Sequence, residues 1–166
     1  QSGSATVLQR MKRKYDTASF LSKLIAIREI RPDIAITTDV IAGFPQESDE
    51  EWQETMGFCR QADFAEIHVF PFSSRPGTLA HALPDVDPKT KKIRVHQLLG
   101  LSHELRENYK KRFYNQKLPV LFEEFDSKSG YAYGHTSNYL LVKIKSEKPL
   151  HGEMAIVTYN NETASD

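Results

Sequence analysis

The sequence has very little cysteine: Cys59 is the only one among 166 residues. A single thiol excludes an internal disulfide and any metal centre built from several cysteines of this chain. Long hydrophobic runs are also absent. No apolar stretch approaches the ~20 residues of a membrane-spanning helix, and no segment resembles a secretory signal. We therefore expect a cytoplasmic protein without membrane contact, whose apolar fraction of 39% suffices for a packed core.

An excess of charge of one sign is missing as well, because 22 basic residues balance 22 acidic ones. The balance fails locally. Residues 88–117 carry nine Lys and Arg against two Glu, whereas residues 118–166 carry four against seven acidic residues. A second basic cluster lies at residues 10–14, where a merely solvated face is the alternative. This clustering predicts two basic segments that can meet an anionic partner.

Helical and strand patterns alternate in the first two thirds of the chain. Apolar periodicity and continuous apolar runs predict both kinds of element. The order indicates βα units on a parallel sheet, so the expected fold class is α/β. We expect helices over residues 16–30, 48–62 and 89–114, and strands over residues 34–42 and 66–72.

After Asn115 the pattern changes to that of short strands separated by turn residues. About 50 residues of this kind predict a small all-β barrel as a second domain. We therefore divide the chain into domains at residues 1–114 and 115–166. The strands are expected over residues 119–125, 131–135, 139–145 and 154–159.

Three segments rich in glycine and polar residues occupy strand-end positions: residues 1–4, 39–47 and 71–78. Ligands of parallel α/β sheets bind at the carboxyl ends of strands, so these segments could line one site together. Asp39 needs a partner, because an unpaired carboxylate near the end of an apolar strand is costly. That partner is either a ligand or an ion pair inside the sheet.

Turn chemistry is the alternative for the second of these segments. Gly43 permits a tight turn, and Ser48 with Glu51 forms a capping box that starts the next helix. Glu66 and His68 alternate onto one strand face and could do acid–base work, although a hydrogen-bonded structural histidine is the alternative. Cys59 lies on an apolar helix stripe and is expected to be a small buried hydrophobe.

Three stretches resemble, in order, signatures of the radical S-adenosylmethionine methylthiotransferases: QSGSATVLQRMKRKY, ITTDVIAGFPQESDEEW and HVFPFSSRPGT. They are most similar to the branch that acts on threonylcarbamoyladenosine or isopentenyladenosine 3′ of the tRNA anticodon, and the third stretch resembles the threonylcarbamoyladenosine subgroup. YAYGHTSNYLLVKI with LHGEMAIV is similar to the TRAM domain, a small RNA-binding β-barrel. The resemblance covers nearly the whole chain.

This resemblance implies the second half of a partial (β/α) barrel, with about three of six strands, followed by an OB-like TRAM barrel. It also implies the insertion of a methylthio group at C2 of the modified adenosine, with S-adenosylmethionine and two [4Fe–4S] clusters as cofactors. In the family the cluster cysteines lie upstream of the matched motifs. We therefore expect this chain to hold neither cluster, to be inactive alone, and to be open to self-association through an exposed sheet edge.

Several cofactor contacts follow from the resemblance, position by position. Ser2 and Ser4 would lie beside S-adenosylmethionine, and Arg13 would meet its carboxylate. Asp39 to Gly43 would line the ribose and adenine, and Phe70 with Pro71 would pack on the adenine. One departure is Gln46, where the family usually has glycine, so the turn there is expected to differ.

The implied partner is the anticodon stem-loop of tRNA. Basic residues of the loop after the second strand and of the long helix would contact phosphates. Tyrosines of the barrel would stack on unpaired bases, with ordinary strand packing as their alternative role. The residues concerned are Arg75, Lys110, Lys111, Arg112, Tyr131, Tyr133 and Tyr139.

Two other functions compete with tRNA methylthiolation. A ribosomal-protein methylthiotransferase shares the barrel motifs but modifies an aspartate side chain. A non-catalytic RNA-binding module would keep the fold without the chemistry. Binding of an anticodon stem-loop favours tRNA over the first competitor, and upstream cluster cysteines favour the enzyme over the second.

Overall fold

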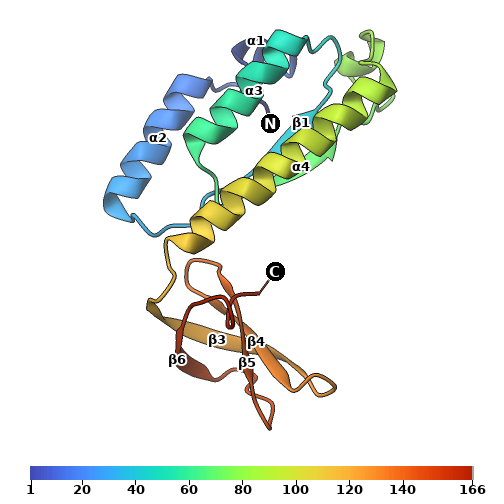
Figure 1. Ribbon diagram of the computed structural model, residues 1–166. Coiled ribbons are helices and arrows are strands. Elements are labelled where there is room, and N and C mark those ends of the chain that lie inside the picture. The colour runs from blue at the N-terminus through green and yellow to red at the C-terminus, as the bar shows by residue number, and fades with distance from the viewer. Residues whose placement is uncertain (166) are drawn as a thin grey trace. The chain divides into compact units, whose positions relative to one another are not determined.

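The computed structural model describes residues 1–165 as a mixed α/β chain with two compact units (Figure 1). The first unit is Gln1–Glu107, and the second begins at Asn108, within the last turn of a long helix. No helix among residues 1–165 has the length and hydropathy that crossing a membrane requires. The domain boundary between residues 114 and 115 stays a prediction, as does self-association.

The predicted helices and strands of the first unit are present and alternate as expected, whereas α1 and the short turn η1 were not predicted. The first strand is shorter than expected, because Thr37 pairs with Glu66, the first residue of its partner, and residues 34–36 precede the ladder. The elements are α1 (Ala5–Arg10), α2 (Thr17–Ile30), β1 (Thr37–Ala42), α3 (Asp49–Ala62), β2 (Glu66–Pro71), the 3₁₀ turn η1 (Leu79–Ala82) and α4 (Pro88–Lys111).

The first unit has one hydrophobic core, between the helices and one face of the parallel β1–β2 sheet (Figure 1). Val40 and Ile67 point into it from the two strands, and Trp52 and Leu98 from α3 and α4. The apolar run of β1 predicted a strand covered on both faces. Within residues 1–165 only one face is covered, because every helix that contributes to the core packs on the same side.

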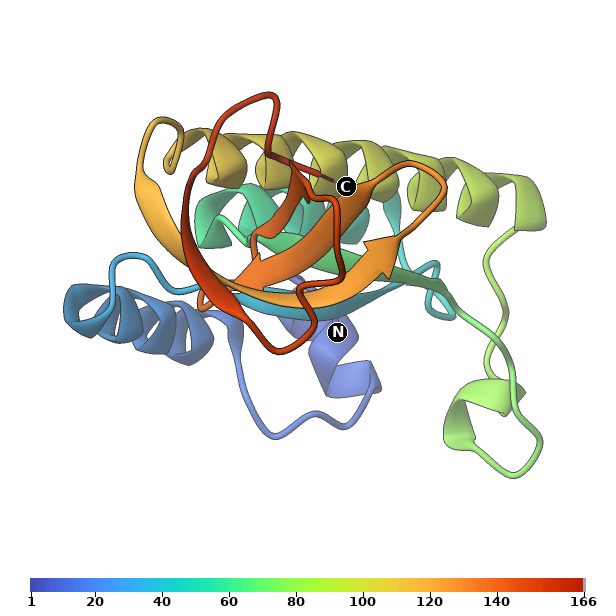
Figure 2. The same cartoon turned by 90° about the horizontal axis from the view of Figure 1, so that it is seen from below.

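The second unit contains a four-stranded antiparallel sheet in the order β5-β4-β3-β6, which curls as a small barrel does (Figure 2). Its core includes Tyr109 from the end of α4 and Phe122 and Val142 from the strands. All four predicted strands are present. They are β3 (Lys117–Asp126), β4 (Tyr131–Thr136), β5 (Leu141–Lys145) and β6 (Met154–Thr158).

Gly134 allows the sheet to curl at the centre of β4. A Cβ atom at this position would overlap the carbonyl oxygen of Leu121 and would lie 2.8 Å from Cα of Phe122. The β3–β4 register also shifts between Phe122 and Glu124, the irregularity that bends a strand. Because both obstructing atoms belong to the backbone, a side chain here cannot be accommodated by a rotamer change.

We expect Gly134→Ala to lower the free energy of unfolding by about 2 kcal/mol or more, because the methyl group overlaps backbone atoms. Gly100→Ala is the matched control: Gly100 is helical with nothing within 4 Å of an added Cβ, so it should stabilise by about 0.5–1 kcal/mol. Urea denaturation followed by circular dichroism measures both. Equal stability of Gly134→Ala and the parent chain would contradict the close approach.

Candidate functional site

The loop after β1 is held by a buried ion pair with the long helix α4. Arg94 Nη1 lies 2.9 Å from both the carbonyl oxygen and Oε2 of Glu47, and its Nη2 lies 2.7 Å from Oδ1 of Asp49. The side chains of Arg94 and Glu47 are 4% and 0% exposed. One guanidinium therefore fixes the loop, the start of α3 and the first third of α4 together.

The carboxylate of Glu47 also completes the turn at Gly43, whose backbone N–H donates to Oε2 at 3.0 Å. Burial raises the pKa of the Glu47 carboxyl, while the Gly43 N–H and Arg94 oppose that shift. Gly43 has φ +72°, and a Cβ there would lie 2.7 Å from Cγ of Lys91. Turn chemistry thus accounts for Gly43 and Glu47.

Gln46 adopts a left-handed conformation with φ 61°. Glycine reaches this region without cost, whereas other residues do so uncommonly. The turn therefore has the conformation that glycine would favour, although the chain has a longer side chain there. The backbone N–H of Gln46 donates to the carbonyl of Pro84 at 3.1 Å, which anchors this conformation.

A second ion pair fixes α1 against the start of α3. Arg10 binds Glu51 with both terminal nitrogens, at 2.8 and 2.6 Å, and the Thr6 hydroxyl donates to the same carboxylate. Ser48 completes the capping box, since its N–H donates to Glu51 and its Oγ accepts from the Glu51 N–H. The bond from Arg10 is the largest cause that lowers the pKa of Glu51 to about 2.

The two serines of the first strand-end segment are buried and bonded within the chain. Ser2 Oγ lies 3.0 Å from Oγ1 of Thr55 and accepts from the Ser4 N–H, and Ser4 Oγ lies 3.0 Å from Oγ1 of Thr6. The carbonyl of Gln1 accepts from the N–H of Ile41 at 2.9 Å. The segment therefore lies beside the end of β1, as predicted, but its hydroxyls face α1 and α3.

An open sheet face carries accessible functional groups of the first unit. Asp39 pairs in register with His68, and Ile41 with Phe70, on the face opposite the helices. Asp39 and His68 are exposed, and Phe70 is 51% exposed. No ion pair involving Asp39 is seen among residues 1–165, so its carboxylate is available to a ligand.

Glu66, predicted to share a face with His68, lies on this open face at its far end. Its Oε1 is 3.6 Å from Nη1 of Arg106. Glu66 is thus paired with Arg106. The acidic residue opposite His68 in the ladder is Asp39, its register partner. Pro71, at the end of β2, is exposed next to Phe70.

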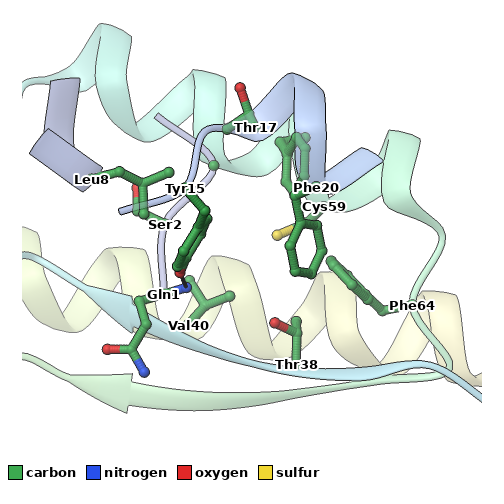
Figure 3. Close-up of a pocket in the computed structure, with 12 residues that line it drawn as sticks. Gln1, Ser2, Leu8, Tyr15, Thr17, Phe20, Thr38, Val40, Cys59 and Phe64 are labelled. Carbon is green, nitrogen blue, oxygen red and sulfur yellow. Dashed lines mark hydrogen bonds between the residues drawn. The ribbon is translucent and has the colours of Figure 1, made fainter. Parts of the chain in front are cut away.

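The helix-covered face of the sheet has a small, mainly apolar pocket of about 50 Å³ (Figure 3). Thr38 and Val40 line it from β1, and Phe20 and Phe64 line it from the helix side. Cys59 also faces it and is 1% exposed, and burial raises the pKa of its thiol to about 12. The pocket is too small for a nucleoside, and the expectation that Cys59 is a buried hydrophobe is confirmed.

The basic residues predicted to bind anions, Arg13 the cofactor carboxylate and the others RNA phosphates, differ in their exposure. Arg13 and Arg75 are exposed, and Arg13 Nη2 donates to Oε1 of Gln1 at 2.6 Å. Lys111 and Arg112 are exposed at the end of α4, whereas Lys110 is 6% exposed. Burial thus separates Lys110 from the accessible cations of this helix, a distinction that sequence order alone does not make.

The tyrosines predicted to stack on bases lie on β4 and its following turn. Tyr131 and Tyr133 are half-buried on the outer face of the sheet, and Tyr139 is 81% exposed. Sequence reasoning missed Lys143 and Lys145, whose amino groups lie 5.8 and 4.0 Å from the centre of the Tyr131 ring. Their spacing of two residues along β5 indicates that they share one face of the strand. Only the strand register shows that this face is the one that carries Tyr131.

Comparison with curated proteins identifies the class to which this chain belongs. The chain is 40% identical over 162 residues to a threonylcarbamoyladenosine tRNA methylthiotransferase of Bacillus subtilis, covering 95% of the chain and 36% of that protein. It is 34% identical to a tRNA-2-methylthio-N6-dimethylallyladenosine synthase of Campylobacter jejuni, covering 97% of the chain and 37% of that protein. A synthase of the same name from Sulfurimonas denitrificans is 37% identical over 154 residues, which are 92% of the chain and 35% of that protein.

The chain therefore belongs to the tRNA methylthiotransferase family, as the three motifs indicated. It spans about a third of the length of the curated relatives that it matches. No family model matches the chain. Relatives named for the two different modified adenosines are similar over nearly the same number of residues, so the similarity is common to both branches.

Removal of one partner of the buried pair should be costly. We expect Arg94→Met to lower the free energy of unfolding by about 3–5 kcal/mol, because it leaves the Glu47 carboxylate buried without its cation. Combining it with Glu47→Gln should recover part of that loss, since the double variant buries no charge and Gln can still accept from Gly43. Urea denaturation gives all values. A double variant less stable than Arg94→Met alone would contradict this explanation.

The Arg10–Glu51 ion pair should make the free energy of unfolding depend on pH in the acid range. A carboxyl whose pKa falls from 4.5 to about 2 on folding stabilises the fold above pH 4.5, and this contribution is lost between pH 4.5 and 2. Glu51→Gln should therefore cost about 1–2 kcal/mol at pH 7 and flatten the acid limb. Glu54→Gln, exposed on the same helix, is the control that should leave the profile unchanged.

Proposed function

We propose that this chain is part of an enzyme that inserts a methylthio group at C2 of a modified adenosine 3′ of the anticodon in tRNA, with threonylcarbamoyladenosine as that nucleoside. The observation that carries the proposal is the similarity over 95% of the chain to a protein named for that reaction. The open sheet face, bordered by strand ends, supports it as a place for cofactor and substrate. A cytoplasmic location agrees with a tRNA substrate.

Residues on and beside the open face fit S-adenosylmethionine by their chemistry. Phe70 and Pro71 present apolar surface for an adenine ring, and Asp39 is an accessible carboxylate that can accept bonds from ribose hydroxyls or an ammonium group. Arg13 is an exposed guanidinium suited to a carboxylate. These four residues are proposed to bind and orient the cofactor.

Ser2, Ser4 and Gly43 are proposed to act on the same site indirectly. Their hydroxyls and N–H groups are bonded within the chain, so they fix the two loops that border β1 rather than offering free donors. This half of the site is therefore preorganised before a ligand arrives, which lowers the entropic cost of binding.

Radical and sulfur-transfer chemistry in the family comes from S-adenosylmethionine and two [4Fe–4S] clusters. Among residues 1–165 no group of three or more His, Cys, Asp and Glu could hold a metal ion. We propose that the cluster ligands belong to the part of the relatives' length that this chain does not span. The proposed contribution of this chain is to bind the cofactor, to exclude water from it with apolar side chains, and to hold the tRNA.

The tRNA is proposed to meet Arg75 and the exposed end of α4 through its phosphates. Lys111 and Arg112 are accessible there, and counterion release by such cations makes nucleic-acid affinity depend on salt. The outer face of the second unit, with Tyr131 and Tyr133, is proposed to form the TRAM-like RNA-binding surface. Assignment of the first unit to the second half of a radical S-adenosylmethionine barrel is part of the same proposal.

The decisive experiment uses the full-length protein that contains this chain, purified anaerobically with its clusters. Incubation with tRNA that lacks the methylthio group should yield the 2-methylthio nucleoside, detected by mass spectrometry of the digested tRNA. Asp39→Asn should lower the yield about tenfold or more, the effect of removing a charged hydrogen-bond partner. The iron content should be unchanged, since the cluster ligands are proposed to lie elsewhere.

Two controls make the result specific. Glu29→Gln, which neutralises an exposed carboxylate on α2, should leave the yield unchanged. Ribosomal protein offered in place of tRNA should gain no methylthio group. Modification of that protein, or absence of any modified nucleoside despite full cluster loading, would contradict the proposed function.

A further inference from the structure

The open face of the β1–β2 sheet changes in polarity along its length. Register partners of a parallel ladder point to the same side, so the face consists of three rows of side chains. The rows are Ile41 with Phe70 at the carboxyl ends, Asp39 with His68 in the middle, and Thr37 with Glu66 at the start. A ligand that lies along this face therefore contacts apolar side chains at one end and charged ones at the other.

His68 has no polar partner within the described chain. It is exposed, and no hydrogen bond or ion pair of this residue is seen among residues 1–165. By contrast, the rings of His81, His135 and His151 each have an oxygen partner. The alternative role for His68, a hydrogen-bonded structural histidine, thus lacks its partner in this part of the protein. Both ring nitrogens are open to a ligand, and a neutral imidazole offers it one donor and one acceptor.

A buried serine attaches the helix α4 to the start of β2. Ser102 Oγ donates to the carbonyl of Ile67 and accepts from the Ile67 N–H, both at 3.0 Å. Arg106 follows one turn later on the same side of the helix. Its Nη1 lies 3.6 Å from Oε1 of Glu66. The helix therefore places a guanidinium beside the row of the open face that adjoins His68.

The pair of Glu66 and Arg106 leaves room for a third group. A distance of 3.6 Å is longer than a hydrogen bond, and the two side chains are 39% and 37% exposed. No hydrogen bond of Arg106 is seen within the described residues, so its N–H donors are available to a carboxylate, which a guanidinium binds with two parallel bonds. Asp39, opposite His68, repels an anion there, and Arg106 supplies the compensating positive charge.

We propose that His68 and Arg106 bind a carboxylate on the N6 substituent of the target adenosine and so select threonylcarbamoyladenosine. The inference rests on the proposed function and names the residues that recognise its nucleoside. A threonylcarbamoyl group ends in a carboxylate and a hydroxyl, whereas a dimethylallyl group is a hydrocarbon. A site that bonds a polar substituent discriminates against an analogue without it, because the polar groups of the site then lose their partner.

The spacing along β2 suits this arrangement. His68 lies about 7 Å from Phe70 along the strand, since each residue of a strand rises by about 3.3 Å. The proposed function places the cofactor adenine at Phe70. The substituent of a nucleoside bound beside the cofactor can therefore extend toward the start of β2, where the two cationic side chains lie.

The test measures the affinity of the full-length protein, purified anaerobically with its clusters, for fluorescently labelled anticodon stem-loops. Three stem-loops differ only in the target adenosine, which carries a threonylcarbamoyl group, a dimethylallyl group or no substituent. The parent protein should bind the first most tightly. His68→Leu should weaken that binding about 10- to 100-fold, the effect of losing a hydrogen bond to a charged group, and leave the other two affinities unchanged.

Two further variants separate recognition from folding. Arg106→Met should cause the same selective loss. His96→Leu is the matched control, because His96 is also exposed without a partner among the described residues but lies on α4, and it should change none of the three affinities. Urea denaturation should show no loss of stability in His68→Leu. A structural role of His68 would weaken all three stem-loops alike and would overturn the inference.

The methionyl carboxylate of S-adenosylmethionine is the other source of this chemistry. Equilibrium dialysis of the cofactor without RNA should give the same affinity for the parent and for His68→Leu. A loss of cofactor affinity with the stem-loop preference intact would assign the pair to the cofactor and overturn the inference. Equal affinity of the parent for the three stem-loops, or an unchanged preference in both variants, would overturn it as well.

Failure of the proposed function gives a different result. Full-length protein that prefers the threonylcarbamoyl stem-loop through His68 but forms no 2-methylthio nucleoside refutes the reaction and retains the carboxylate site. Formation of that nucleoside with the same preference in the parent and in His68→Leu retains the reaction and refutes the carboxylate site.

Discussion

The buried pair of Arg94 and Glu47 is the constraint on which the first unit depends. It joins residues 47 positions apart and places one guanidinium on a carbonyl, a buried carboxylate and the first turn of α3. A two-stranded parallel sheet has little stability of its own, so its position relative to the helices must come from such contacts and from the core. The same carboxylate holds the Gly43 N–H, which connects packing to the shape of the strand-end loop.

As a consequence of these contacts, rigid loops border the open face of the β1–β2 sheet. Polar groups in the loops, including those of Ser2, Ser4 and Glu47, are used for internal bonds, and few remain for a ligand. Asp39 and His68 do remain, and they stand on the uncovered side of the sheet. Parallel sheets normally have both faces covered, and the proposed function places cofactor and substrate on the face that is open here.

In the second unit, the close approach of two strands determines the shape of the sheet. Gly134 lets two strands approach so closely that the sheet curls, and the inner side chains then form a small core. The outer side chains are left to display rings and cations. The proposed function gives both surfaces a common purpose: one unit offers groups for a cofactor, and the other offers stacking surface for unpaired bases.

Local sequence was enough to define the elements and the family. Periodicity, the capping box at Ser48 and the turn at Gly43 act over a few residues, so the strands and the three longer helices could be predicted and three ordered motifs recognised, whereas the short α1 and η1 were missed. Long-range packing settled which groups are accessible: Lys110 is buried, the hydroxyl of Ser2 is bonded, and Lys143 and Lys145 gather on Tyr131. These outcomes depend on contacts between residues far apart in the chain, where strand register and burial set the geometry and local pattern carries no information.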